Sequence, residues 1–241
     1  MRCIVISLLI LVLLIPHLFA VVGGPSPQAK KEAAKGHWST WRSPNRDGLS
    51  AETGLLSSWQ ERGPKLAWKV KGLGNGLSSV AVTEGRIYTM GKRDGTIKMI
   101  ALNSKDGAKI WESDIGSEAN EGPNSTPSVD GDRVYGLTHA GRLVCVSTTD
   151  GSILWRKHLP TDFKGKMESG WGYSEPAIVD GNNLICTPGG NSGVMVALNK
   201  KTGEHLSSVE MPAVLVTEVM TVLDTPQLSS VELLDASNTY S

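Results

Sequence analysis

The sequence predicts an all-β fold built from repeated units of four short antiparallel strands. Three segments align with one another: SSVAVTEGRIY from Ser78, STPSVDGDRVY from Ser125 and SEPAIVDGNNLI from Ser174. A second segment follows each of them: ALNSKDGAKIW, VCVSTTDGSILW and VALNKKTGEHLS. The leading serines are 47 and 49 residues apart. A period in the forties, with apolar residues at alternate positions, is typical of the blades of a β-propeller.

Each unit is predicted to contain four strands in the same order. The first strands are expected at 79–82, 127–129 and 176–179, and the second at 87–91, 134–138 and 184–188. The third are expected at 97–103, 143–148 and 194–199. Aspartate–glycine and similar turns join them, because glycine adopts positive φ without steric cost. The fourth strand follows Gly107, Gly151 or Gly203 and is predicted to end at the tryptophan position.

Tryptophan supplies seven of the thirteen aromatic residues, and the repeats give that excess a structural reason. Trp111 and Trp155 end the first two repeats, whereas the third has Ser207 at this position. A tryptophan on an outer strand buries about 200 Å² when it docks against a neighbouring blade. The earlier GPKLAW, ending at Trp68, is predicted to be the closing strand of a preceding blade. GLGNG (72–76) precedes a strand, so it is interpreted as a loop leading into a blade and not as a phosphate loop.

Composition and spacing argue against several kinds of site. The 24 basic and 24 acidic residues cancel, which disfavours nucleic acid as a partner. No histidine or cysteine spacing fits zinc. The two acids of DGDR (130–133) are too few for calcium and are interpreted as a hairpin turn. Cys145 and Cys186 lie in apolar strand patterns, which favours two small buried thiols over a disulfide.

The N-terminus has the pattern of a secretory signal peptide. Arg2 precedes an apolar run, Ile4 to Ile15, and Ala20 offers a small residue for cleavage. The run ends at Pro16, short of the roughly 20 residues of a membrane-spanning helix. We therefore expect a signal peptide at 1–20, a linker at 21–37 and export to the periplasm or medium. The alternative is an uncleaved anchor, which would be the chain's only membrane attachment.

ALNSKDGAKIW resembles the tryptophan-docking motif of quinoprotein-type propellers, Ala-x-Asp-x-x-Thr-Gly-x-x-x-Trp. Gly107 and Trp111 match it in the first repeat, Gly151 and Trp155 in the second, and Gly203 in the third. WRSPNRDGLSAETGLLSSW (41–59) is similar to the N-terminal segment of secreted bacterial PQQ-like propeller proteins, which are BamB-like or polyvinyl-alcohol-dehydrogenase-like. The resemblance covers about 38–205. Its motifs are specific for the propeller fold, and a fold does not fix a reaction.

The repeats stop before a ring of blades is complete. All 27 glycines lie in the first 203 residues, and 206–241 contains neither glycine nor tryptophan. About three to four blades are therefore expected, where propellers have 4–8. We interpret 38–205 as an incomplete ring and 206–241 as a divergent tail, out of frame from near His205. The alternative is a native capping segment. Open blade edges would favour self-association.

Two functions of different classes are consistent with these patterns. The first is an exported, non-catalytic propeller that binds a protein or polymer on its faces or rim. The alternative, which the resemblance implies, is a quinoprotein dehydrogenase-like enzyme with PQQ and calcium in its channel. Ser79, Thr126 and Glu175 precede the innermost strands at equivalent positions, and Trp171 and Tyr173 could stack on a planar ligand. The sequence identifies no catalytic residue, no metal ligand and no cofactor outside this alternative, so the binding protein is preferred.

Overall fold

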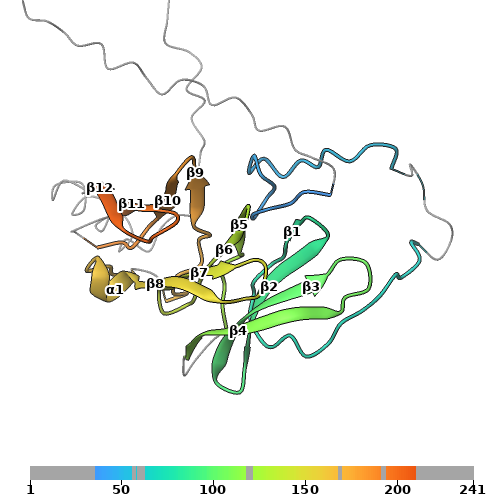
Figure 1. Ribbon diagram of the computed structural model, residues 1–241, viewed down its shortest axis with the longest axis horizontal. Coiled ribbons are helices and arrows are strands. Elements are labelled where there is room, and N and C mark those ends of the chain that lie inside the picture. Colours follow the sequence, from blue (N-terminus) through green and yellow to red (C-terminus); the bar gives the residue numbers. More distant parts are fainter. Residues whose placement is uncertain are drawn as a thin grey trace, which may run out of the picture. The chain divides into compact units, whose positions relative to one another are not determined.

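The computed structural model describes residues 36–55, 58, 63–117, 122–167, 170–190 and 194–209. The predicted signal peptide, most of the linker and the tail from 210 onward lie outside the described residues. Within the described residues the fold is all-β, with three four-stranded antiparallel sheets and one short helix (Figure 1). This confirms the predicted fold class, and each sheet is called a blade below.

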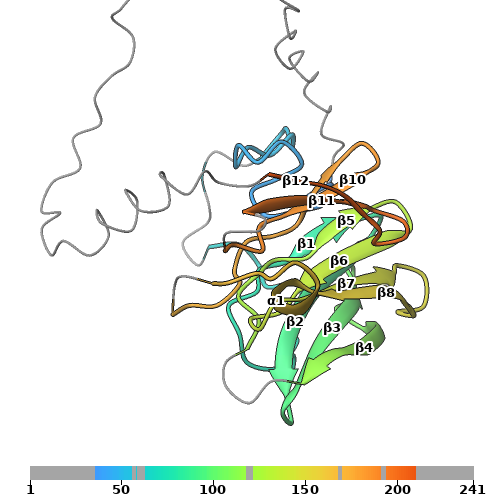
Figure 2. The same cartoon turned by 90° about the vertical axis from the view of Figure 1, so that its left-hand side faces the viewer.

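The strands follow one another within each blade, so no strand crosses between sheets. The first blade contains β1 (Ala81–Thr83), β2 (Arg86–Arg93), β3 (Thr96–Asn103) and β4 (Lys109–Ser117). The second contains β5 (Ser128–Asp130), β6 (Arg133–Leu137), β7 (Arg142–Ser147) and β8 (Ile153–His158). The third contains β9 (Ile178–Asp180), β10 (Asn183–Cys186), β11 (Met195–Asn199) and β12 (His205–Val209). The innermost strands are neighbours, since β1 contacts β5 and β5 contacts β9. Figure 2 shows β1 beside β5.

Three details differ from the sequence prediction. The outer strands continue beyond the tryptophan position, because Trp111 pairs with Ala101 near the start of β4 and the ladder runs on to Ser117. Residues 63–70, which were predicted to close a preceding blade at Trp68, form no β-strand. The four-residue helix α1 (Leu159–Asp162) was not predicted, because its proline at the first turn and its short length give no helical periodicity.

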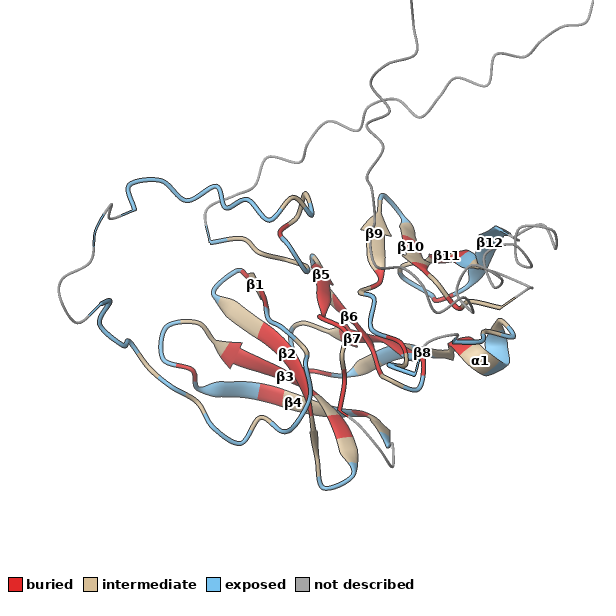
Figure 3. Ribbon diagram, turned by 180° about the vertical axis from the view of Figure 1, so that it is seen from behind, coloured by how far each residue is buried: buried red, intermediate tan, exposed pale blue. Residues whose placement is uncertain are grey.

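Apolar side chains pack between neighbouring blades and form two clusters. The first joins Met90 and Met99 of the first blade to Val134 and Val144 of the second. The other cluster lies between the second and third blades, and it includes Leu159 of α1, which is fully buried. Burial is therefore concentrated in the middle strands of the blades (Figure 3). Middle strands covered on both faces lose the alternation of polar and apolar residues, as β3 shows from Met99 to Leu102.

Both cysteines in the described residues are free and buried, as predicted. Cys145 lies on β7 and Cys186 on β10, in the cluster between the second and third blades. Removal from water disfavours the thiolate, so burial raises the pKa of each thiol to about 12. These thiols are packing groups and not nucleophiles at neutral pH. Within the described residues, no helix has the length and apolar character needed to cross a membrane.

Candidate functional site

Three tryptophans, Trp68, Trp111 and Trp155, each pack against a turn of the blade that follows in the chain. The Trp111 ring lies on Gly151 of the second blade, and a Cβ atom at Gly151 would meet that ring at 2.8 Å. Its indole Nε1 donates to the Thr148 carbonyl at 2.9 Å. The docking glycine of a repeat therefore does not receive the tryptophan of its own repeat. It receives the tryptophan of the preceding blade, which the linear motif cannot reveal.

The same contact recurs on either side of this pair. Trp68 lies on Gly107 and donates to the Ser104 carbonyl at 3.1 Å. Trp155 lies on Gly203 and donates to the Lys200 carbonyl at 3.2 Å. The three glycines have φ of +73°, +78° and +72°, so the backbone conformation and the close aromatic contact both require glycine. Position 207 pairs with Ala197, which corresponds to the pairing of Trp111 with Ala101.

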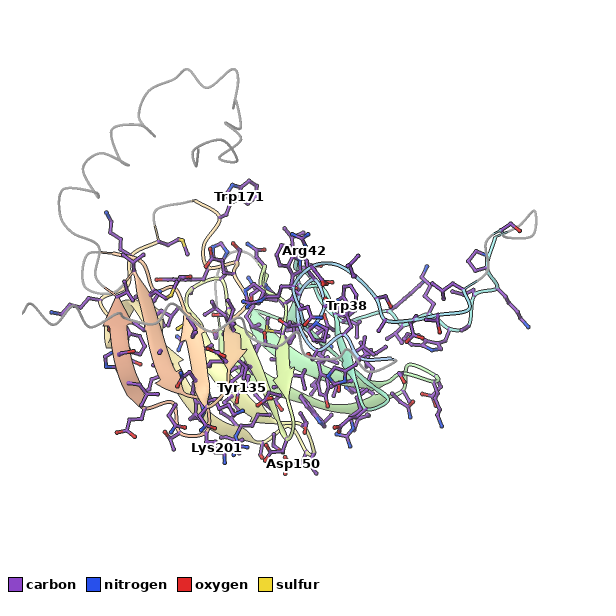
Figure 4. All side chains as sticks on the ribbon, turned by 90° about the horizontal axis from the view of Figure 1, so that it is seen from above. Trp38, Arg42, Tyr135, Asp150, Trp171 and Lys201 are labelled. Carbon is purple, nitrogen blue, oxygen red and sulfur yellow. The ribbon has the colours of Figure 1, made fainter. Side chains whose placement is uncertain are left out.

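The hairpin turns that carry these glycines lie at one end of the blades, called the lower face. The opposite end is called the upper face, and it carries the β2–β3 hairpin and the loops leading into the innermost strands. Figure 4 shows Trp171 and Arg42 at the upper face, with Asp150 and Lys201 at the lower face. The lower turns are occupied in joining blades, which leaves the upper face and the innermost edges as surfaces for a functional site.

A segment before the first blade covers the innermost edges of two blades. Trp38 exchanges two backbone hydrogen bonds with Val82 of β1, at 2.6 and 2.7 Å. The Ser39 carbonyl accepts a bond from the amide of Val129 in β5 at 2.7 Å. The Thr40 hydroxyl lies 2.9 Å from the hydroxyl of Ser128. These edges would otherwise face the propeller axis, so residues 38–40 occupy part of the region where a channel ligand would lie.

This segment continues into a tight turn that reaches the upper face. Arg42, Ser43 and Arg46 have φ of +62°, +79° and +57°, which is uncommon for residues other than glycine. The turn is held because the buried Ser43 hydroxyl donates to Asp47 Oδ1 at 2.9 Å. The Arg42 guanidinium lies 5.5 Å from the centre of the Trp41 ring. In the sequence the stretch from Trp41 shows only a family resemblance, and the pairing of residues 38–40 with the blades was not predicted.

The GLGNG loop is bound to the first blade through its backbone. Asn75 exchanges two backbone hydrogen bonds with Lys92, at 2.9 and 2.7 Å. A Cβ at Gly74 would lie 2.6 Å from the Lys92 carbonyl oxygen, and a Cβ at Gly122 would lie 2.2 Å from the Asn75 carbonyl oxygen. The glycines therefore permit close approach of backbone to backbone and do not cradle a phosphate. This placement agrees with the interpretation of GLGNG as a loop leading into a blade.

Beside this loop is a hollow of about 520 Å³ on the upper face. Ligand pockets are typically about 300–1,000 Å³ in volume. The polar side chains around it are Asn75 and Asn124, Lys92 and Asp94. Leu77 adds an apolar wall, and glycines form most of the remainder. Asn124 links this lining to the loop of Trp171, because its Nδ2 donates to the Trp171 carbonyl at 2.9 Å.

The residues predicted to face the channel have separate environments. Tyr173 is buried, and its hydroxyl donates to the Pro188 carbonyl at 2.8 Å. Burial raises the pKa of this phenol. Glu175 is exposed and its carboxylate accepts a hydrogen bond from the Thr187 hydroxyl. Trp171 is 68% exposed and points to solvent. Of these three residues, Trp171 alone has an exposed aromatic face.

The equivalent positions in the first two blades contact each other. The amide of Ser79 donates to Thr126 Oγ1 at 3.3 Å. Thr126 is buried, whereas Ser79 is exposed. The Ser125 hydroxyl then donates to the Glu175 carbonyl at 3.2 Å, which links the second blade to the third. These residues join adjacent blades just above the innermost strands.

A bound PQQ with calcium does not fit this arrangement. A planar quinone needs aromatic faces and a carboxylate gathered at the channel, but the Tyr173 ring packs against Gly141 and the Glu175 carboxylate is engaged by Thr187. Residues 38–40 also cover the innermost edges of two blades. Within the described residues, no group of three or more histidine, cysteine, aspartate or glutamate side chains lies close enough to hold a metal ion.

The repeated four-stranded sheets and their tryptophan docking define a β-propeller repeat protein. A family model described as outer membrane protein assembly factor BamB matches residues 43–238, and the chain belongs to that family. No curated protein matches the sequence.

Solved structures with similar folds include BamB from Moraxella catarrhalis, 20% identical with a TM-score of 0.41. The quinohemoprotein alcohol dehydrogenase ADHIIG from Pseudomonas putida HK5 is 23% identical with a TM-score of 0.43. The aligned part is 61% of this chain and 41% of BamB, and 58% of this chain and 22% of the dehydrogenase. The computationally designed protein Ika4 is 14% identical with a TM-score of 0.43, over 61% of this chain and 79% of Ika4. The chain thus spans less than half the length of BamB and of the dehydrogenase.

Proposed function

We propose that this chain is an exported, non-catalytic binding protein that holds an extended polymer ligand on the upper face of its blades. The observation that carries the proposal is Trp171, which is 68% exposed although the turn on which it sits is firmly anchored. Large exposed aromatic groups on rigid supports are frequent anchors of binding surfaces. The apolar N-terminal run supports export, and the family description, outer membrane protein assembly factor, supports a macromolecular ligand.

The anchoring of the Trp171 turn uses contacts on both sides of the indole. On one side, the Trp171 carbonyl accepts the Asn124 amide. On the other, the amide of Tyr173 donates to the His139 carbonyl at 3.0 Å. Gly172, at φ +66°, lies so close to the His139 ring that a Cβ atom would be 2.5 Å from it. A turn held in this way loses little conformational entropy when a ligand binds, which favours affinity.

The coverage of the innermost edges by residues 38–40 also supports binding through the outer loops. A ligand on the propeller axis would have to displace three backbone hydrogen bonds made by Trp38 and Ser39. A ligand on the upper face meets the Trp171 indole and the hollow beside Asn124 without breaking any of them. The upper face is therefore the favoured position for the ligand.

The proposal is tested with the mature chain, expressed from residue 21. The probes are a urea-denatured outer-membrane β-barrel polypeptide, diluted into buffer, and insoluble bacterial and plant polysaccharides in a sedimentation assay. PQQ with Ca²⁺ is titrated in parallel by calorimetry. Binding of at least one polymer, weakened in Trp171→Ala, is expected. Leu206→Ala, a change at an exposed residue of β12, is the matched control.

Two results would overturn the proposed function. One is the absence of polymer binding, or polymer binding that Trp171→Ala leaves unchanged. The other is stoichiometric binding of PQQ with Ca²⁺ accompanied by dye-linked oxidation of alcohols, which would establish the enzyme instead. The folding of each variant is checked by its urea unfolding midpoint, so loss of binding is separated from loss of structure.

A further inference from the structure

We infer that the polymer is a neutral polysaccharide, and that one of its sugar units occupies the hollow lined by Asn75, Leu77, Lys92, Asp94 and Asn124. This inference rests on the proposed function and names the class of ligand that the upper face fits. Three observations support it: the hydrogen-bonding groups of the lining, the balance of its charges, and the fact that the edge of β2 beside the hollow is already paired.

The lining offers donors and acceptors in mixed order. The Asn75 amide donates and accepts, and the Asp94 carboxylate only accepts. Asn124 and Lys92 also line the hollow, but the Asn124 amide already donates to the Trp171 carbonyl and Lys92 already interacts within the protein. A sugar hydroxyl also donates and accepts at one atom, so neighbouring hydroxyls of a pyranose ring match such a set. Within the described residues the Asn75 side chain makes no hydrogen bond to another residue, so its amide is available to a ligand.

The charges around the hollow disfavour a polyanionic ligand. Lys92 and Asp94 come from the same end of the β2–β3 hairpin and contribute opposite charges. Binding of a phosphodiester or sulfated chain depends on several cations that neutralise successive anionic groups. The described residues of the lining have balanced charge and provide no such set, so an uncharged ligand is favoured.

The backbone around the hollow disfavours a polypeptide. A peptide usually binds next to a sheet by pairing with an exposed strand edge. At the end of β2 that position is already taken, because Asn75 pairs with Lys92 through two hydrogen bonds. Peptide recognition also relies on apolar pockets for side chains, and Leu77 is the only large apolar residue among the described residues that line the hollow.

The Trp171 indole supplies the second element of the site. Its turn is joined to the wall of the hollow through the hydrogen bond from Asn124. The face of an indole carries partial negative charge, and the axial C–H groups of a pyranose ring carry partial positive charge, so the two stack favourably. Leu77, which is 73% exposed, gives a second apolar contact within the hollow. Two such contacts along one surface fit successive units of a chain better than a single free sugar.

The experiment uses the mature chain and a panel of soluble neutral hexasaccharides: cellohexaose, chitohexaose, maltohexaose and xylohexaose. Calorimetry is expected to show one site per chain for at least one of them. Asn75→Ala removes the amide but keeps the backbone pairing with Lys92, and Asp94→Asn keeps the hairpin turn. Each is expected to raise Kd about two- to tenfold, the range of one lost hydrogen bond. Trp171→Ala is expected to raise Kd about five- to tenfold.

The outcomes separate this inference from the proposed function. If the denatured polypeptide binds in a Trp171-dependent manner and none of the hexasaccharides binds, the ligand class is wrong and the proposed function stands. If a hexasaccharide binds equally well to Asn75→Ala and Asp94→Asn, the hollow is not its site. If neither polymer binds, both ideas fail. Leu206→Ala should leave every Kd unchanged.

Discussion

The contact between Trp111 and Gly151 predicts that two similar glycines differ sharply in their tolerance of alanine. Gly131 and Gly151 both lie in lower-face turns of the second blade, with φ of +56° and +78°. Nothing lies within 4 Å of a Cβ atom at Gly131. A Cβ at Gly151 would lie 2.6 Å from Ser113 Oγ and 2.8 Å from the Trp111 ring. Alanine at either position meets the same backbone penalty, but only at Gly151 does it also displace a neighbouring blade.

The size of each effect follows from these distances. A left-handed backbone costs an alanine about 1–2 kcal/mol, which is the whole effect expected for Gly131→Ala. Forcing a methyl group into a packed aromatic contact adds about 1–3 kcal/mol. Gly151→Ala should therefore lower the free energy of unfolding by about 2–5 kcal/mol. The excess over Gly131→Ala corresponds to a further drop in Tm on the order of 5 °C for a chain of this size.

The assay is urea unfolding of the full mature chain, followed by circular dichroism and by tryptophan fluorescence. The third blade repeats the comparison, because Gly203 lies under Trp155 and Gly181 has open space around it. If Gly131→Ala and Gly151→Ala lower the free energy of unfolding equally, within about 0.5 kcal/mol, the ring does not hold the blades together. The argument for docking between blades would then be wrong.

Three further predictions concern the contacts between blades. Trp111→Ala should destabilise the chain by about 3–5 kcal/mol in urea unfolding, and a loss below about 1 kcal/mol would contradict its docking role. Burial raises the pKa of Cys145 and Cys186 to about 12, so the native fold holds protons that the unfolded chain releases near pH 8.5. Stability should thus be unaffected by these thiols below about pH 8 and should fall above it by about 1.4 kcal/mol per pH unit and thiol, until the folded pKa is reached. A Cys145→Ala/Cys186→Ala variant should flatten that alkaline slope, and an unchanged slope would refute the assignment. The Asp130–Lys200 ion pair, 2.5 Å apart between the second and third blades, should show a coupling of about 1 kcal/mol or less in a double-mutant cycle, and that coupling should shrink in high salt.

Much of the fold could be predicted because its signals are local. The positions of the hairpin turns follow from glycines beside acidic or polar residues, and the strands between them alternate in polarity or run apolar. The turn between the first and second strands of each blade, the turn between its third and fourth strands, and the order of its strands are therefore visible in any single repeat. The extent of the outer strands was not predictable in this way, because β4 and β8 continue through polar residues such as Glu112 and Lys157 that pair across the ladder.

The candidate site was predicted only in part. Trp171, Tyr173 and Glu175 were singled out together because they are close in sequence, yet the fold gives them separate roles. Tyr173 is buried against Gly141, and Trp171 is exposed. The turn at Gly172 points the Trp171 and Tyr173 side chains in different directions. Only contacts with the surrounding loops determine which of the two enters the core. The hollow beside Asn75 and Asn124 was missed, because these residues come from the loops that lead into different blades.

The sequence by itself determined the repeat, the turns and the all-β character of this protein, since each depends on a few neighbouring residues. Only the tertiary structure decided how the repeats join. The indole of each docking tryptophan bonds to a carbonyl 36 to 45 residues further along the chain. Residues 38–40 likewise reach two strands that the sequence places far from them. Contacts over such separations form when the blades assemble, because their surfaces pack together and their unpaired hydrogen-bonding groups find partners. A local sequence pattern does not specify which residue becomes the partner.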